Sequence, residues 1–343
     1  LEELVDLDEA THIAERLGQA VAVPINLSGY EVFSSASIGI ALCSGGMERP
    51  EYLLRNADVA MYRAKGAGAS RYEVFDRTMH AQALERLQME TDLRRALQRG
   101  EFRLHYQPIV SLARGTITGV EALLRWEHTE RGLTSPGEFI PVAEETGLIL
   151  PLGAWVLTEA CRQLAEWRAE FPQARIALSV NLSAKQFGQA DLVERIRAAL
   201  DDAGLDPRHL KLEITESAII DHPGSAGAML RQLKELGIQV QMDDFGTGYS
   251  SLSSLHSLPL DGLKIDRSFV SRMPEDRATM QMVRTIALLA RGLDLAVIAE
   301  GVETQAQMDE VRAMGCDYAQ GYLIAPPLDP EGIRALLAED PRW

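Results

Sequence analysis

Short apolar segments that alternate with helical segments constrain the fold of this chain more than any other feature. The alternation begins near Phe102 and runs to the end of the 343 residues. Strands that alternate with helices form parallel sheets, and many repeats of this unit in one domain predict an α/β barrel. The predicted strands cover residues 102–107, 119–126, 176–181, 211–215, 239–243, 262–266, 296–300 and 318–321. The predicted helices cover residues 154–170, 192–203, 226–236, 278–289 and 304–314.

Two shorter segments precede the predicted barrel. Residues 1–77 have the pattern of a small α/β unit, with a helix at 8–17, strands at 30–33 and 36–41, an amphipathic helix at 51–65 and a closing strand at 72–75. Leucines at near-helical spacing predict a linker helix over residues 78–99. The expected domains are therefore 1–77, 78–99 and 100–343.

The acidic composition limits the classes of ligand that the chain can bind. Its formal net charge is -16. A protein that binds DNA or RNA polymers needs a basic surface, so we expect no nucleic-acid polymer as a partner. A small phosphate ligand stays compatible with this charge, because a bound metal ion can supply positive charge locally.

Cysteine usage and the lack of long apolar segments bear on location. The three cysteines are far apart in the sequence and form no CxxC motif, which is typical of reduced thiols in the cytosol. No run of about 18 apolar residues occurs, and the acidic first residues do not resemble a signal peptide. We expect a cytoplasmic location and no membrane segment in this chain; membrane anchoring of a longer protein stays open.

Five predicted strands turn a polar side chain away from their apolar face. Side chains alternate across a strand, so Glu213 lies opposite the face formed by Leu212 and Ile214. In a barrel the second face of each strand points to the interior, and active sites are built at the carboxyl ends of the strands. The residues that face inward by this argument are Glu121, Arg125, Asn181, Glu213, Asp243, Lys264 and Asp266.

The inward-facing acids predict a bound cation. Burying several unpaired acids is costly, so a positive charge should hold them together. A single acid at a strand end is usually a helix cap or an ion-pair partner, but five strands with the same pattern indicate a shared site. Oxygen ligands suit Mg²⁺ or Mn²⁺ better than zinc, and two such ions commonly promote phosphodiester hydrolysis. The candidate ligands are Glu121, Asn181, Glu213, Asp243 and Asp244.

The order of these residues resembles the motifs of one enzyme family. The tripeptide Glu121-Ala122-Leu123 is similar to the signature of the EAL family of cyclic di-GMP phosphodiesterases. The resemblance continues from about Leu97 to Leu337. The further matching motifs are Asn181-Leu182-Ser183, Glu213-Ile214-Thr215-Glu216, Asp243-Asp244-Phe245-Gly246-Thr247-Gly248, Lys264-Ile265-Asp266, Glu300-Gly301-Val302-Glu303 and Gln320-Gly321-Tyr322.

The resemblance implies a site with two Mg²⁺ or Mn²⁺ ions. Asp243 and Asp244 would hold the second ion, and Glu300 would reach it through water. Lys264 would orient the attacking water, so Lys264, Glu300, Glu121, Asp243 and Asp244 are the implied catalytic residues. The implied ligands of the first ion are Glu121, Asn181, Glu213 and Asp243.

The resemblance also implies substrate contacts and a loop anchor. Arg125 would bind a substrate phosphate, because its planar fork matches phosphate oxygens. Glu216 would anchor the loop at residues 245–252, which in the family shapes the second metal site and the dimer interface. The implied substrate-binding residues are Gln107, Leu123, Arg125, Glu303 and Gln320.

A modified TIM (β/α)8 barrel with one antiparallel strand is the fold that the resemblance implies. The implied reaction is the hydrolysis of cyclic di-GMP to linear pGpG, and the implied assembly is a homodimer through the barrel. Three alternatives stay open: an effector that binds cyclic di-GMP without cleaving it, an interaction scaffold, and a metal phosphodiesterase of broad specificity.

The front unit resembles the second half of a GGDEF diguanylate cyclase domain. The segments 36–39 and 57–65 carry the resemblance, but the GGDEF loop does not occur in this sequence. Ala69 stands where the family pattern has a basic residue. We therefore expect residues 1–77 to be a structural remnant without cyclase activity in this chain.

Overall fold

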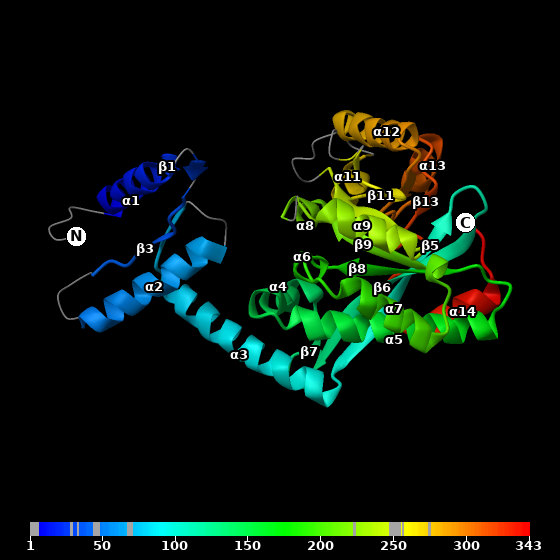
Figure 1. The fold of residues 1–343 in the computed structure, drawn as a ribbon, viewed down its shortest axis with the longest axis horizontal. Coiled ribbons are helices and arrows are strands. Elements are labelled where there is room, and N and C mark those ends of the chain that lie inside the picture. The colour runs from blue at the N-terminus through cyan, green and yellow to red at the C-terminus, as the bar shows by residue number, and fades with distance from the viewer. Residues whose placement is uncertain are drawn as a thin grey trace. The chain divides into compact units, whose positions relative to one another are not determined.

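The chain forms two compact units, Leu1–Asp92 and Leu93–Trp343. The structure, a computed structural model, describes residues 7–27, 30–32, 34–43, 49–66, 71–221, 224–246, 255, 257–273 and 276–343. Helix α3 (Arg77–Arg99) contains the boundary between the two units (Figure 1). No helix in these described ranges is long and apolar enough to cross a membrane.

The first unit contains a two-stranded parallel sheet that packs against helix α2. Strands β3 and β4 pair in parallel, and β1 and β2 form a separate antiparallel pair. A Cβ atom on Gly39 would lie 1.9 Å from the carbonyl oxygen of Ala57, so only glycine allows α2 to approach β3 this closely. The predicted elements occur here, but β1 was not predicted, and Phe33 lies outside the described residues. The elements are α1 (Leu7–Val21), β1 (Ile25–Leu27), β2 (Tyr30–Val32), β3 (Ile38–Ile40), α2 (Pro50–Gly66) and β4 (Tyr72–Val74).

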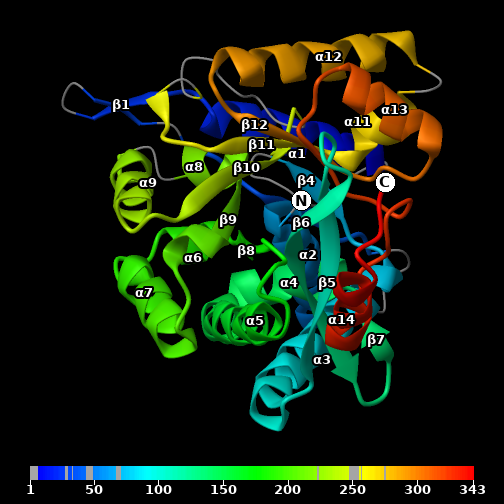
Figure 2. The ribbon, with the colours of Figure 1, turned by 90° about the vertical axis from the view of Figure 1, so that its right-hand side faces the viewer.

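The second unit is a closed barrel surrounded by helices. Figure 2 shows helices α5, α7, α9, α12 and α13 outside the ring of strands. The strands are β5 (Phe102–Ser111), β6 (Thr116–His128), β7 (Gly132–Thr134), β8 (Ala177–Leu182), β9 (Leu210–Thr215), β10 (Gln239–Phe245), β11 (Gly262–Ile265), β12 (Ala296–Ala299) and β13 (Tyr318–Ala319). The helices are α4 (Pro136–Thr146), α5 (Ile149–Glu170), α6 (Ala184–Phe187), α7 (Leu192–Ala203), α8 (Glu216–Ile220), α9 (Ala226–Glu235), α11 (Arg267–Arg272), α12 (Arg277–Gly292), α13 (Gln305–Ala313) and α14 (Pro330–Glu339).

The strand order confirms a modified TIM barrel. Among the described residues the sheet runs β5-β13-β12-β11-β10-β9-β8-β6, and pairing of β5 with β6 closes it. Strand β5 is antiparallel to both neighbours, β13 and β6, whereas the other barrel pairs are parallel. Strand β7 extends the sheet from β6 outside the barrel. It was not predicted, because three residues are too few to show alternation.

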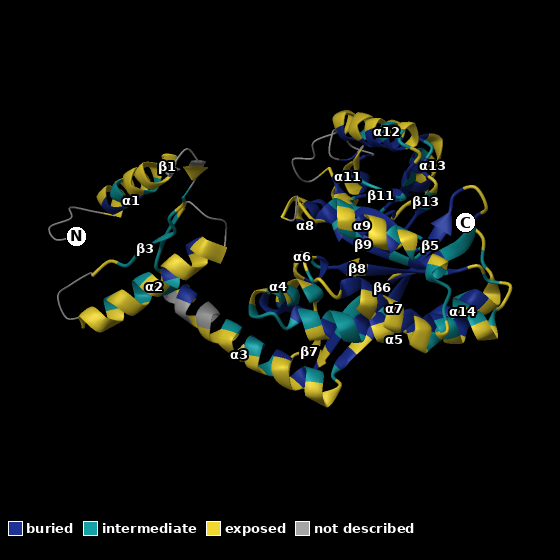
Figure 3. Cartoon of the chain, viewed as in Figure 1, coloured by how far each residue is buried: buried dark blue, intermediate teal, exposed yellow. Residues whose placement is uncertain are grey.

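The apolar faces of the strands form the main core beneath the helices. Figure 3 shows the strands as mostly buried and the outer faces of the helices as exposed. Leu212, Val240 and Leu263 are completely buried. Truncating such a residue to alanine typically costs about 2–5 kcal/mol. This packing fixes the opposite face of each strand toward the barrel interior, which positions the polar side chains there.

Side chains in the barrel interior form layers that come from alternate strands, as is usual in this architecture. Register and contacts place one layer on β6, β9, β11 and β13, with Glu121, Glu213, Lys264 and Gln320. The intervening strands β8, β10 and β12 carry Asn181, Asp243 and Glu300 toward the carboxyl ends. The same strands carry Ser179, Gln241 and Ile298 on the amino-terminal side of that layer.

Candidate active site

A buried lysine lies among four carboxylates at the centre of the barrel. Lys264 is 1% exposed, and its Nζ lies 2.5 Å from Glu213 Oε2 and 2.6 Å from Glu300 Oε1. The same atom lies 3.3 Å from Asp243 Oδ1 and 3.4 Å from Glu121 Oε2. Strand β11 therefore places one ammonium group between acids from β6, β9, β10 and the end of β12.

Two amides hold the Glu121 carboxylate in place. Gln320 Nε2 donates to Glu121 Oε2 at 2.7 Å, and Asn181 Nδ2 donates to Glu121 Oε1 at 2.6 Å. Gln320 Nε2 also contacts Gln107 Oε1 at 3.0 Å, and Gln107 Nε2 donates to the carbonyl of Ala325 at 3.1 Å. Both oxygens of Glu121 thus have hydrogen-bond partners, which fixes the plane of the carboxylate.

A break in strand alternation brings Asp243 and Asp244 to one end of the barrel. Consecutive residues of a regular strand face opposite sides. The register of β10 against β11 shifts between Met242 and Phe245, and Asp244 has a left-handed φ of 54°. Such irregularities re-aim side chains and occur next to active sites. Carboxylate oxygens of Asp243, Asp244 and Glu300 lie within 4.8 Å of one another.

The cluster contains more negative charge than one lysine balances. If all five acids (Glu121, Glu213, Asp243, Asp244 and Glu300) are ionised, Lys264 leaves a net charge of −5 + 1 = −4. Two divalent cations would neutralise this charge. Three of the five acids respond to the excess with raised pKa values, as follows from their burial and their neighbours.

The pKa values differ according to each residue's surroundings. Burial and the neighbouring Glu121 raise the pKa of Glu213 well above its ordinary value. Burial raises the pKa of Glu300 to about 8 despite Lys264. Asp244 is exposed at the end of β10, and partial desolvation together with the neighbouring Asp243 raises its pKa to about 6. Burial also acts to raise the pKa of Glu121, but Lys264 and the two amides hold that pKa below its ordinary value. Burial opposes the charge of Lys264, but the surrounding acids raise its pKa well above the usual range.

The remaining predicted site residues lie around this cluster. Arg125 is half-buried near the end of β6, where burial lowers its pKa while Tyr322 and Glu121 oppose that change. Leu123 is half-buried on the same strand. Glu303 is exposed, and its backbone N–H donates to Gln307 Oε1 at 2.8 Å, next to the start of α13. Their roles as substrate contacts stay predictions.

Glu216 occupies the first position of α8, directly after β9. Its side chain is buried, and neither carboxylate oxygen has a hydrogen-bond partner among the described residues. The predicted loop at 245–252 is described only for Phe245 and Gly246; residues 247–252 lie outside the described ranges. The anchoring role of Glu216 therefore stays a prediction.

The residues present fit a divalent metal. Glu213 Oε1 is buried and has no hydrogen-bond partner in the described part of the chain, and the only partner of Asp243 Oδ1 there is the Lys264 ammonium at 3.3 Å. Buried carboxylate oxygens without partners are costly, and an oxygen-rich set without histidine or cysteine suits Mg²⁺ or Mn²⁺. The cluster of Asp243, Asp244 and Glu300 offers three such oxygens in close proximity.

Comparison with known proteins identifies the family. Residues 90–327 match the EAL domain family. The chain belongs to the EAL family. Residues 2–71 match the family described as diguanylate cyclase, GGDEF domain, which confirms the resemblance of the front unit.

Several relatives of this EAL protein have been named or solved. It is 46% identical over 330 residues to the bifunctional diguanylate cyclase/cyclic di-GMP phosphodiesterase MucR of Pseudomonas aeruginosa. This match covers 96% of this chain and 48% of MucR. It is 38% identical over 316 residues to the cyclic di-GMP phosphodiesterase PdeR of Escherichia coli, covering 92% of this chain and 47% of PdeR. A solved structure of the PaMucR phosphodiesterase in complex with c-di-GMP aligns with 72% of this chain, with 46% identity and a TM-score of 0.69. The alignment includes 99% of the solved PaMucR chain. This chain therefore spans about half the length of the curated relatives it matches.

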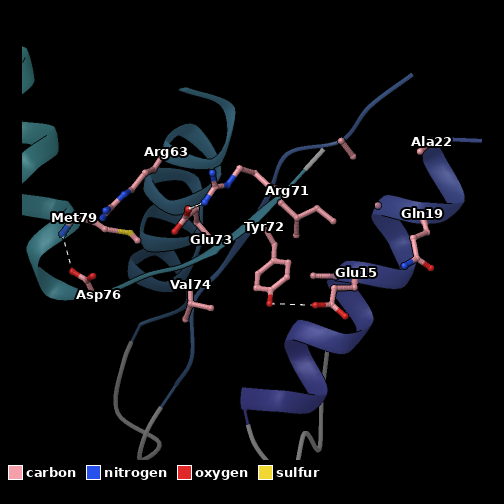
Figure 4. A pocket seen from close by; sticks show the side chains of 14 residues that line it. Glu15, Gln19, Ala22, Arg63, Arg71, Tyr72, Glu73, Val74, Asp76 and Met79 are labelled. Carbon is pink, nitrogen blue, oxygen red and sulfur yellow. Dashed lines mark hydrogen bonds and ion pairs between the residues drawn. The ribbon is translucent and has the colours of Figure 1, made fainter. Parts of the chain in front are cut away.

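A cavity of about 750 Å³ lies in the GGDEF-like unit, between α1, α2 and the β3–β4 sheet (Figure 4). Two pairs of its polar side chains are in contact. Arg71 lies 2.7 Å from Glu73, and the Tyr72 hydroxyl lies 3.5 Å from Glu15. Among the described residues, the lining of this cavity holds no set of convergent acids comparable to that around Lys264. We therefore assign the candidate active site to the EAL domain.

The sequence reasoning assigned no role to two buried polar residues of the EAL barrel. Ser179 and Gln241 are 1% and 2% exposed and face the interior; Gln241 is the register partner of Glu213, and Ser179 is paired with Glu121 and Lys211. Their parity matches that of Asn181 and Asp243, so the inward direction was available from the sequence. An uncharged polar residue near a strand centre gives no further signal of function.

Proposed function

We propose that the EAL domain of this protein hydrolyses cyclic di-GMP to linear pGpG with Mg²⁺ or Mn²⁺, two ions per site. The observation that carries the proposal is the set of five acids at the carboxyl ends of the barrel strands, four of which lie within 3.4 Å of Lys264 Nζ. Active sites of barrel enzymes are built at this end. The names of MucR and PdeR, and the c-di-GMP complex of PaMucR, support cyclic di-GMP as the substrate.

The acids and one amide would hold the metal ions. Asp243 and Asp244 would hold the second ion with Glu300 close by, and the proximity of these three carboxylates, whose oxygens lie within 4.8 Å of one another, supports this assignment. Bound there, the ions would neutralise charge on the attacking and leaving oxygens of the phosphodiester. The proposed ligands of the first ion are Glu121, Asn181, Glu213 and Asp243.

The protein's own residues would position the reactants. Lys264 holds Glu213 and Glu300 in place and would orient the attacking water. Gln320 fixes Glu121 and is linked to Gln107, so both amides would define one wall of the substrate site. Arg125 would bind two non-bridging oxygens of a substrate phosphate through its planar guanidinium group. Leu123 and Glu303 would contact the rest of the dinucleotide.

The chain is divided into three parts in the same proposal. We expect the EAL domain to begin near residue 100 after the linker helix 78–99, with the GGDEF-like unit at 1–77 as a structural remnant. A homodimer through the barrel and a cytoplasmic location are expected from the family resemblance and the ligand, and size-exclusion chromatography with light scattering would test the dimer.

Product analysis tests the function. Purified protein is incubated with cyclic di-GMP and Mn²⁺, and the nucleotides are separated by chromatography. Wild-type protein should form pGpG only with metal, whereas Glu121→Ala should form none. Retention of intact cyclic di-GMP with high affinity and no product would instead favour a non-catalytic effector. Cleavage of other cyclic nucleotides at equal rates would favour a phosphodiesterase of broad specificity, and absence of Mn²⁺ binding would favour a scaffold.

A further inference from the structure

Ser179 and Gln241 lie on the two strands that flank the strand of Glu213. Strand β9 carries Glu213 and pairs with β8 on one side and β10 on the other. Glu213 is the direct register partner of Gln241, and Ser179 is paired with Lys211, two residues before Glu213. By parity all three side chains face the barrel interior. Ser179 and Gln241 therefore lie beneath the carboxylate layer, on either side of Glu213.

Each of the three side chains has a polar atom without a partner. Ser179 Oγ, Glu213 Oε1 and Gln241 Oε1 are buried and make no hydrogen bond within the described part of the chain. The other oxygen of Glu213 is held by Lys264 at 2.5 Å, so the two oxygens of this carboxylate have different surroundings. Buried polar atoms nearly always have a partner in native proteins, and buried waters commonly supply it.

The donors and acceptors of the three atoms match those of one water molecule. Glu213 Oε1 and Gln241 Oε1 can only accept when Glu213 is ionised, and a water has two hydrogens to donate. The Ser179 hydroxyl can donate its hydrogen to the water oxygen. Three hydrogen bonds to otherwise unsatisfied groups are typical of buried waters.

Gly262 lies against the Gln241 amide, so a side chain longer than alanine at this position would enter the space of that amide. It is the register partner of Gln241 on β11. A Cβ atom at this position would lie 3.4 Å from Gln241 Nε2 and 3.0 Å from the carbonyl oxygen of Ala296. The absence of a side chain on Gly262 thus lets a long amide side chain lie inside the barrel beside Glu213.

We propose that one buried water joins Ser179, Gln241 and Glu213, and that Ser179 and Gln241 are positioning residues for the Glu213 carboxylate. The water fixes the direction of Oε1, the oxygen that Lys264 does not hold. The inference rests on the proposed function only where it treats Glu213 as a metal ligand. Residues that orient metal ligands through hydrogen bonds typically change metal affinity by about 10–100-fold when they are replaced.

A crystal structure of the metal-free wild-type protein tests the water directly. At a resolution that shows ordered waters, we expect density within hydrogen-bond distance of all three atoms, and loss of that density in Gln241→Met. A direct contact between Gln241 and Glu213 without intervening density would overturn the proposal. This test needs no catalytic activity, so a wild-type protein that fails to cleave cyclic di-GMP would refute the proposed function without deciding this inference.

Mn²⁺ titration of variants tests the positioning role. Ser179→Ala and Gln241→Met should each weaken Mn²⁺ binding by about 10–100-fold. The double variant should bind about as weakly as the weaker single variant, because both act through one water. Ile298→Val, a change in the same layer without a polar atom, should leave the affinity unchanged. Effects of the two single variants that multiply in the double variant would show independent action and overturn the proposal.

Discussion

Replacing Lys264 by methionine should destabilise the metal-free EAL domain strongly. The side chain is 1% exposed and its ammonium group contacts Glu213, Glu300, Asp243 and Glu121 at 2.5–3.4 Å. Methionine keeps most of the side-chain volume but removes the positive charge. With all five acids ionised, the net charge of the cluster changes from −4 to −5. Removing one partner of a buried ion pair costs about 3–5 kcal/mol. For a domain of this size, about 2–4 °C per kcal/mol gives a loss of about 6–20 °C in Tm.

Tryptophan fluorescence is a suitable assay for this loss. All four tryptophans (Trp126, Trp155, Trp167 and Trp343) lie in the second unit, so their signal reports unfolding of the EAL domain. Melting is recorded at pH 8 with a chelator, with Lys185→Met as the matched control, because Lys185 is exposed. A surface substitution should change stability by no more than about 0.5 kcal/mol. Added Mn²⁺ should recover part of the loss in Lys264→Met, because divalent charge replaces the ammonium group.

The pH dependence of this variant has a defined sign. Its buried acids bind protons more tightly in the folded chain than in the unfolded chain, where glutamate has a pKa of about 4.3. As the pH rises from about 5 to 8, the unfolded chain therefore holds fewer protons than the folded one, and stability falls. The difference from wild type should grow over this range. A Tm at pH 8 within about 2 °C of wild type would refute the account of Lys264 as the cation that stabilises the cluster.

Three further predictions follow from the site. Apparent Mn²⁺ affinity should rise between about pH 6 and 8, because binding displaces protons from Asp244 and Glu300, whose pKa values are about 6 and 8. Calorimetry in two buffers of different ionisation enthalpy measures the released protons, and an affinity that does not change with pH would contradict this prediction. Gly321→Ala should destabilise the domain by about 1–3 kcal/mol and reduce turnover, because the new Cβ would lie 2.1 Å from the Val302 carbonyl oxygen, next to Gln320. The control Gly292→Ala should stabilise the domain by about 0.5–1 kcal/mol, because a Cβ at Gly292 has nothing within 4 Å. Urea unfolding compares the two variants, and equal effects would contradict the packing argument. Arg125→Lys should raise KM for cyclic di-GMP by about 10-fold or more and leave Mn²⁺ affinity unchanged, whereas Arg131→Lys, at an exposed position, should change neither quantity. Steady-state kinetics and Mn²⁺ titration measure both quantities, and a loss of metal binding in Arg125→Lys would disprove a role limited to the substrate phosphate.

The sequence predicted the barrel and most of the acid cluster for a physical reason. Alternation across a strand has a period of two, so an acid such as Glu213 between Leu212 and Ile214 has a definite direction once the apolar face is known. The same rule fails for Asp244, because the register shift and the left-handed φ at this residue break the alternation. Only the structure shows that Asp243 and Asp244 meet at Glu300.

Other features could not be derived from the sequence because they depend on distant contacts. The four-acid environment of Lys264 joins residues from Glu121 to Glu300, and no local pattern encodes those distances. The hydrogen bonds that Gln320 makes to Glu121 and Gln107 join strands at opposite ends of the domain sequence. Short elements such as β7 and the irregular end of β10 are decided by tertiary contacts rather than by local propensity.

Counting bound Mn²⁺ and formed pGpG on the same sample tests the central claim most directly. Wild-type protein is titrated with Mn²⁺ in the presence of cyclic di-GMP, and bound metal and product are measured at each point. The account predicts that pGpG formation rises as up to two Mn²⁺ bind per chain, and that Glu213→Gln loses both. Product formation that does not depend on bound metal, or that survives in Glu213→Gln, would contradict it.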